Sequence, residues 1–178
     1  KVFLDLKLHD IPNTVNRAMR VLSALDIDMC NVHAAGTVEM MSAALKGLER
    51  EDGRRPVLIA VTQLTSTSQQ QLESDLMIDE EMEKVVAHYG YNAKVAGLDG
   101  VVCSPLESEK VHGVCGGDFL TVTPGVRFAD DDKVDQRRVT TPARAKELGS
   151  DYIVVGRSIT ASDNPLAAYE RCVDEFVG

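Results

Sequence analysis

Three charged residues lie close together near the start of the sequence, in the segment FLDLKLHDIPNTV. Asp5, Lys7 and Asp10 alternate with, or follow, apolar residues of the kind that form a buried strand. An unpaired charge is costly to remove from water, so we expect these charges to form ion pairs or to take part in a reaction. Residues two apart in a strand share a face, so Asp5 and Lys7 point the same way. The pattern predicts an ammonium group kept protonated by carboxylates and able to protonate a substrate carbon.

The same residues also allow a purely structural interpretation. Asp5 and Lys7 could form an ion pair at the end of the strand, and Asp10 or Asn13 could cap the following helix. The spacing of the charges does not by itself choose between a catalytic and a structural role.

Two later apolar segments each end in a glycine and an arginine. TVTPGVR contains Gly125 and Arg127, and IVVGRS contains Gly156 and Arg157. Glycine lets backbone N–H groups approach phosphate oxygens, and a guanidinium group adds forked, charge-assisted hydrogen bonds. Ordinary turns with surface arginines are the alternative, but two such ends on consecutive strands favour a phosphate site.

Two polar segments follow strand ends, where binding loops are common. In AVTQLTSTS, the hydroxyl groups of Thr65 and Ser66 could bond the edge of a polar ring. In DDDKVDQRR, Gln136 is a neutral group within a charged segment that could close over a site. An ordinary turn and a solvated charged loop are the alternatives.

The elements that would position these residues alternate between strands and helices. We expect strands at residues 2–6, 29–33, 57–61, 100–103, 119–122 and 152–155. We expect helices at residues 15–25, 38–48, 80–96, 107–114, 142–148 and 165–176, with loops at 65–74 and 129–138. This alternation is typical of parallel strands joined by helical crossovers.

Polar residues at the ends of many strands favour a (β/α)8 TIM barrel over a doubly wound sheet, because a barrel gathers its strand ends at one mouth. The sequence contains neither a GxGxxG nor a GxxxxGK[ST] motif, which would favour the doubly wound alternative. A barrel needs eight strands and six are expected here. We therefore expect this chain to hold the last six βα units, with two further units ahead of Lys1.

Composition narrows the class of partner. The chain has 178 residues, 44% of them hydrophobic, which suits a single domain, and its net charge is −9. An acidic chain without a basic stripe is a poor nucleic-acid binder, so we expect a small-molecule partner. The sequence has no run of about 18 apolar residues, the length that would predict a membrane span. Four scattered cysteines predict reduced, buried thiols and a cytoplasmic location.

Taken together, FLDLKLHDIPNTV, VTQLTSTS, DGVVCS, TVTPGVR with DQRRV, and IVVGRSIT resemble the orotidine 5′-phosphate decarboxylase family over essentially the whole chain. The resemblance implies a cofactor-free and metal-free carboxy-lyase that converts orotidine 5′-phosphate to UMP in de novo pyrimidine biosynthesis. It also implies a homodimer with shared active sites, and no nucleic-acid or membrane partner.

The family's D-x-K-x-x-D array matches Asp5, Lys7 and Asp10, and it implies that Lys7 protonates the substrate. The second aspartate of this motif serves the neighbouring subunit in the family, so Asp10, Ile11 and Thr14 would serve the partner's site. Family members also carry an aspartate and a lysine on the first two barrel strands, which the 178 residues do not include.

The remaining substrate contacts implied by the resemblance come from loops at strand ends. The pyrimidine would be contacted by Thr65 and Ser66. The 5′-phosphate would be held by Arg127, Gly156 and Arg157, and Gln136 would close over it.

Two other functions remain open at this point. A sugar-phosphate decarboxylase or aldolase of the same barrel superfamily also uses a D-x-K-x-x-D array, but with Mg2+; the HDIPNT continuation and the TPGVR…DQRRV segments argue against it. The other is a protein that binds nucleotide phosphates without turnover, against which the intact Lys7 and its two carboxylates argue.

Overall fold

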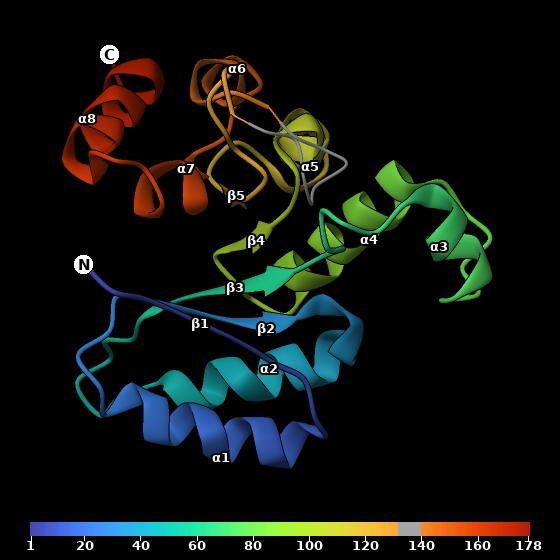
Figure 1. Ribbon diagram of the computed structural model, residues 1–178. Coiled ribbons are helices and arrows are strands. Elements are labelled where there is room, and N and C mark those ends of the chain that lie inside the picture. Colours follow the sequence, from blue (N-terminus) through green and yellow to red (C-terminus); the bar gives the residue numbers. More distant parts are fainter. Residues whose placement is uncertain (132–139) are drawn as a thin grey trace.

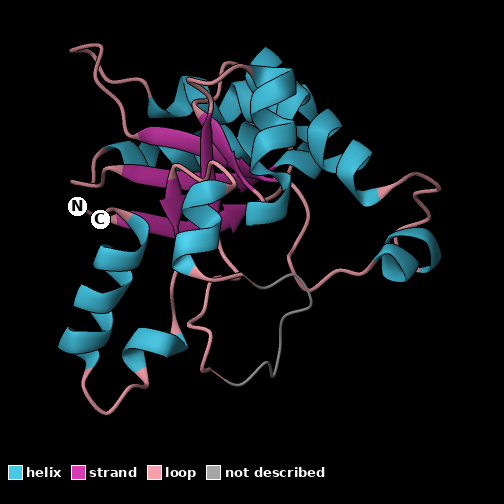
Figure 2. Cartoon of the chain, turned by 90° about the horizontal axis from the view of Figure 1, so that it is seen from above, coloured by secondary structure: helices cyan, strands magenta, loops and turns pink. Residues whose placement is uncertain are grey.

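The alternating segments form a parallel sheet of six strands with helices around it in a computed structural model, which describes residues 1–131 and 140–178 (Figures 1 and 2). The strands are β1 (Phe3–Leu8), β2 (Met29–His33), β3 (Val57–Val61), β4 (Gly100–Val102), β5 (Leu120–Thr123) and β6 (Tyr152–Ile153). Each strand pairs in parallel with the next one along the chain. This sequential order is that of a barrel wall, whereas a doubly wound sheet reverses its order at a switch point.

Helices lie between successive strands and after the last one. They are α1 (Pro12–Ser23), α2 (Thr37–Leu48), α3 (Gln69–Ser74), α4 (Met82–Val95), α5 (Ser108–Cys115), α6 (Pro142–Glu147), α7 (Arg157–Thr160) and α8 (Pro165–Phe176), with short 3-10 turns η1 (Ala34–Gly36) and η2 (Pro105–Glu107). All the predicted elements are present, and β2, β3 and α8 have the predicted bounds. α1 begins earlier than predicted because Pro12 occupies its first turn.

The prediction of an irregular loop at residues 65–74 was wrong in its second half, where α3 lies. Ser68 and Gln71 form a reciprocal capping box: the Ser68 hydroxyl accepts from the Gln71 N–H, and the Gln71 side chain accepts from the Ser68 N–H. Only Leu72 of this helix is buried, so the segment shows no apolar periodicity. The four-residue α7 was missed as well.

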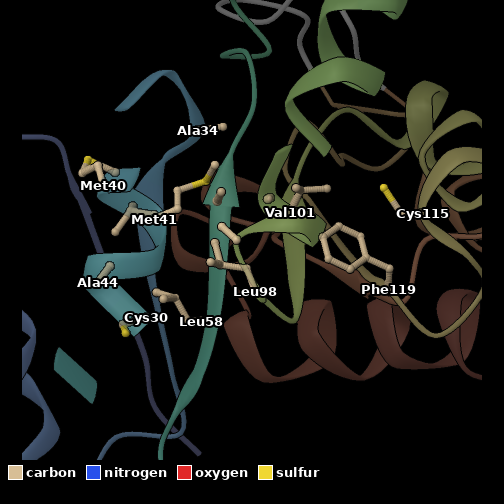
Figure 3. Close-up of a cluster of buried hydrophobic side chains, with 14 of the residues drawn as sticks. Cys30, Ala34, Met40, Met41, Ala44, Leu58, Leu98, Val101, Cys115 and Phe119 are labelled. Carbon is tan, nitrogen blue, oxygen red and sulfur yellow. The ribbon is translucent and has the colours of Figure 1, made fainter. Parts of the chain in front are cut away.

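Alternation along β3 separates two apolar layers. Leu58 and Ala60 face the helices and belong to the larger core, in which Met40 and Met41 of α2 also lie (Figure 3). Ile59 and Val61 face the inside of the curved sheet and pack in a smaller cluster. That inner layer forms a floor beneath the carboxyl ends of the strands.

All four cysteines are buried and, within the described residues, none is in a disulfide, as the sequence predicts. None of the described helices is long and apolar enough to cross a membrane. The two βα units expected ahead of residue 1 stay a prediction.

The close approach of β4 to β5 depends on Gly100. A Cβ atom at this position would lie 2.3 Å from the carbonyl oxygen of Leu120. We expect Gly100→Ala to lower the free energy of unfolding by about 1–3 kcal/mol, because two paired strands must move apart. Urea unfolding measures the effect. Gly117→Ala is the matched control, since its added Cβ would meet nothing within 4 Å; equal stability of the two variants would contradict the prediction.

Candidate active site

The predicted pair of Asp5 and Lys7 is formed at the end of β1. The Lys7 Nζ atom donates to both carboxylate oxygens of Asp5, at 2.7 Å each. The two side chains therefore lie on the same side of the strand. Both are partly exposed, with side-chain exposures of 37% for Lys7 and 48% for Asp5, so a substrate can reach the ammonium group.

The strand reaches this arrangement through a bulge, which simple alternation does not predict. Leu4 pairs with Cys30 and Leu8 with Val32, so three residues of β1 lie opposite the single residue Asn31. Lys7 has a φ of 52°, a left-handed conformation that costs a non-glycine residue about 1–3 kcal/mol. Such a residue persists only where its surroundings hold it.

The bulge also overturns the expectation that Leu4, Leu6 and Leu8 all point toward the helices. Leu4 and Leu8 pack against the larger core, but Leu6 is 48% exposed. Two extra residues in the strand take Leu6 out of the regular period of two.

The residue that contacts both members of the pair is Asn31 on β2, which was not predicted. Its Nδ2 atom donates to Asp5 Oδ1 at 2.6 Å, and its Oδ1 atom accepts from the Lys7 backbone N–H at 2.7 Å. Asn31 is only 1% exposed. A polar amide in the apolar strand MCNVH was the available signal, but the sequence does not show which residues it would meet.

Hydrogen bonds hold Asp5 in its ionised form. Burial acts to raise the pKa of Asp5, but the hydrogen bonds from Lys7 and Asn31 outweigh it, and the pKa lies below its ordinary value. The nearby His33 is shifted toward neutrality: burial, with the charges of His9 and Lys7, lowers its pKa against the opposing effect of Asp5. The ammonium of Lys7 supplies positive charge beside Asp5 at this strand end.

Asp5 and Lys7 line a cavity of about 280 Å³ together with the predicted residues Thr65 and Ser66. Thr65 is buried and Ser66 is exposed. The rest of the lining comes from the inner faces and ends of β1, β3, β4, β5 and β6 and is mostly apolar: Phe3, Val61, Gln63, Leu64, Val102, Pro124 and Val154. Gln63, which is 9% exposed, adds an amide that the sequence reading missed.

Asp10, Ile11 and Thr14 lie apart from this cavity. Asp10 follows β1, and its carboxylate accepts from the Ile11 N–H at 2.6 Å. Among the described residues, no ion pair joins Asp10 to Lys7. Asp10 and Thr14 are exposed, and Ile11 is exposed to 67%.

The predicted phosphate residues lie at the ends of β5 and β6, but in two different cavities. Arg127, whose backbone N–H donates to Thr140, lines one of about 400 Å³. Arg157 begins α7 directly after Gly156 and lines one of about 500 Å³. Phe128 and Asp131 line both of these cavities, so the two cavities adjoin, and neither arginine is among the residues that line the cavity of Lys7. Gln136 lies outside the described residues.

Over residues 1–172, the sequence matches the orotidine 5′-phosphate decarboxylase / HUMPS family. It is 59% identical over 181 residues to orotidine 5′-phosphate decarboxylase of Bacillus cytotoxicus, and the match covers 100% of this chain and 76% of that protein.

Two crystal structures share the fold. One is of orotidine 5′-phosphate decarboxylase from Lactobacillus acidophilus, at 44% identity and a TM-score of 0.87, covering 100% of this chain and 76% of that chain. The other is of an uncharacterized conserved protein from Geobacillus kaustophilus, at 47% identity and a TM-score of 0.85, covering 98% and 75% of the two chains. The described sheet of six strands therefore corresponds to a large part of a TIM barrel.

Proposed function

The chain belongs to the orotidine 5′-phosphate decarboxylase / HUMPS family, and we propose that it converts orotidine 5′-phosphate to UMP in pyrimidine biosynthesis. The observation that carries this proposal is the ion pair of Lys7 with Asp5, in a cavity that also holds Thr65 and Ser66. Two relatives that are 59% identical to this chain over 181 residues are named orotidine 5′-phosphate decarboxylase, which favours decarboxylation over the sugar-phosphate chemistry considered above.

The reaction needs fixed charge, which Lys7 supplies. When the bond from C6 to the carboxylate breaks, CO2 leaves and its electron pair stays on C6, in the plane of the ring. The ring π system cannot delocalise that pair, so a preorganised cation is needed. The Lys7 ammonium stabilises the developing carbanion and then gives its proton to C6, and water reprotonates the amine. Asp5 pairs with the ammonium of Lys7 and directs it.

The remaining predicted contacts complete the proposed binding site. Thr65 and Ser66 face the same cavity as Lys7, which supports a role in holding the pyrimidine. Gly156 and Arg157 at the end of β6, Arg127 after β5, and Gln136 would bind the 5′-phosphate. Binding energy from this remote group can then be used to orient the ring against Lys7.

The proposal includes a homodimer in which Asp10, Ile11 and Thr14 act in the partner's site. The exposed side chains of Ile11 and Asp10 support this proposal. A subunit interface would cover the apolar Ile11 and would bring the Asp10 carboxylate to the partner's site. A cytoplasmic location is supported by four buried thiols outside any disulfide.

We expect decarboxylation of orotidine 5′-phosphate, followed by absorbance, to proceed at the same rate with and without EDTA. The physical reason is that the ammonium of Lys7 occupies the carboxylate oxygens of Asp5 that a divalent cation would otherwise ligate. The assay uses the protein at its full natural length. Activity lost to EDTA and restored by Mg2+ would favour the sugar-phosphate alternative, and nucleotide binding without turnover would favour the non-catalytic one.

A further inference from the structure

We propose that Asn31 is a positioning residue that fixes the direction of Lys7 by holding the bulge of β1, an inference that rests on the proposed decarboxylase function. Asn31 is not among the residues that line the cavity of Lys7, so it acts through its neighbours and not by contact with substrate. Its role is argued from the two hydrogen bonds it makes to Asp5 and Lys7.

The side chain of Asn31 replaces a backbone partner of Lys7. In a regular parallel ladder the Lys7 N–H would bond to a carbonyl oxygen of the neighbouring strand. The bulge removes that regular pairing between Leu4 and Leu8, and the side-chain oxygen of Asn31 accepts the N–H instead, at 2.7 Å. Because Asn31 is almost fully buried, water does not readily replace this bond. The left-handed turn at Lys7 is thus held from β2.

The two hydrogen bonds of the Asn31 amide fix its orientation. Its nitrogen faces a carboxylate oxygen of Asp5 and its oxygen faces an N–H of Lys7. Rotation of the amide by half a turn would set oxygen against oxygen and N–H against N–H, both repulsive. One side chain therefore fixes a backbone donor and a carboxylate at the same time.

The two hydrogen bonds of Asn31, which together form a clamp on Asp5 and Lys7, also act on the ammonium group. Asp5 Oδ1 accepts from both Asn31 and the Lys7 Nζ atom, so the carboxylate that directs the ammonium is itself held by Asn31. Without Asn31, both the main chain and the side-chain partner of Lys7 lose a contact. A misplacement of about 1 Å in a reacting group can cost on the order of 100-fold in rate.

We expect Asn31→Ala to lower kcat by on the order of 100-fold, with the KM for orotidine 5′-phosphate within about threefold of its original value. Steady-state kinetics on the full-length protein measures both. Asn16→Ala is the matched control: its side-chain amide donates to the Ala43 carbonyl between two helices, away from the cavity, so kcat should be unchanged. Asn31→Asp keeps the shape and the acceptor for Lys7 but sets an oxygen against Asp5, and it tests the clamp if the alanine variant does not fold.

A second readout is independent of activity. The backbone amide of Lys7 should exchange its hydrogen faster in Asn31→Ala than in Asn16→Ala, because only the first loses the acceptor. Unchanged exchange at Lys7, or kcat values for both Asn31 variants that match Asn16→Ala, would overturn the clamp. A full-length unsubstituted protein without decarboxylase activity would overturn the proposed function, and the exchange measurement would still decide whether Asn31 holds Lys7.

Discussion

Replacing Lys7 by alanine is expected to lower the rate of decarboxylation by at least about 10⁴-fold, because one substitution removes both the proton donor and the charge that stabilises the carbanion. Each effect alone contributes on the order of a hundredfold or more, and both act on the same carbon. The side chain is also the partner of Asp5, whose carboxylate would be left without its ammonium. The loss should appear in kcat.

UMP binding separates this loss from a general failure of the site. The proposed phosphate contacts, Arg127 and Arg157, lie outside the cavity of Lys7, so titration calorimetry should still detect UMP binding by Lys7→Ala. Lys84→Ala is the matched control, since it breaks an exposed ion pair between Lys84 of α4 and Glu80 just before that helix, and it should leave the rate unchanged. Substantial turnover by Lys7→Ala would remove Lys7 from the role of proton donor.

The order of elements was predictable because each strand carries its own short apolar signal. β3 is buried on both faces and its apolar residues run continuously, while β2 is mostly buried and keeps Met29, Cys30 and Val32 around the single amide of Asn31, so the bounds of both strands follow from the sequence. α3 was not predictable in this way, because a capping box and one buried leucine hold it and both are hidden in a polar segment. A short helix of this kind depends on local hydrogen bonds that periodicity does not register.

The ion pair of Asp5 and Lys7 was predictable for a similar reason, since both residues lie two apart on one short strand. What the spacing could not show is the bulge at Lys7 or the amide that holds it. Asn31 is 24 residues further along the chain, and the contact exists only because β2 pairs with β1. Contacts between strands depend on register, and register is set by the packing of the whole sheet.

The proposed sharing of sites between subunits predicts that two inactive variants restore activity when mixed. In a heterodimer of Asp10→Ala and Lys7→Ala, one site receives an intact Lys7 from the first subunit and an intact Asp10 from the second. The other site carries both defects. With free exchange of subunits, half of the dimers are mixed and one site in each is intact, so we expect about a quarter of the unsubstituted activity. The assay follows decarboxylation after exchange of the full-length variants.

The matched control is a mixture of Asp5→Ala with Lys7→Ala. Both residues lie on β1 and form an ion pair within one chain, so no site in that heterodimer is intact and no activity should return. Asp10, in contrast, follows the end of the same strand, and among the described residues no ion pair joins it to Lys7 of its own chain. This geometry is expected of a residue that acts in the partner's site. If mass spectrometry confirms mixed dimers and Asp10→Ala with Lys7→Ala still recovers nothing, Asp10 acts in the site of its own subunit or in none.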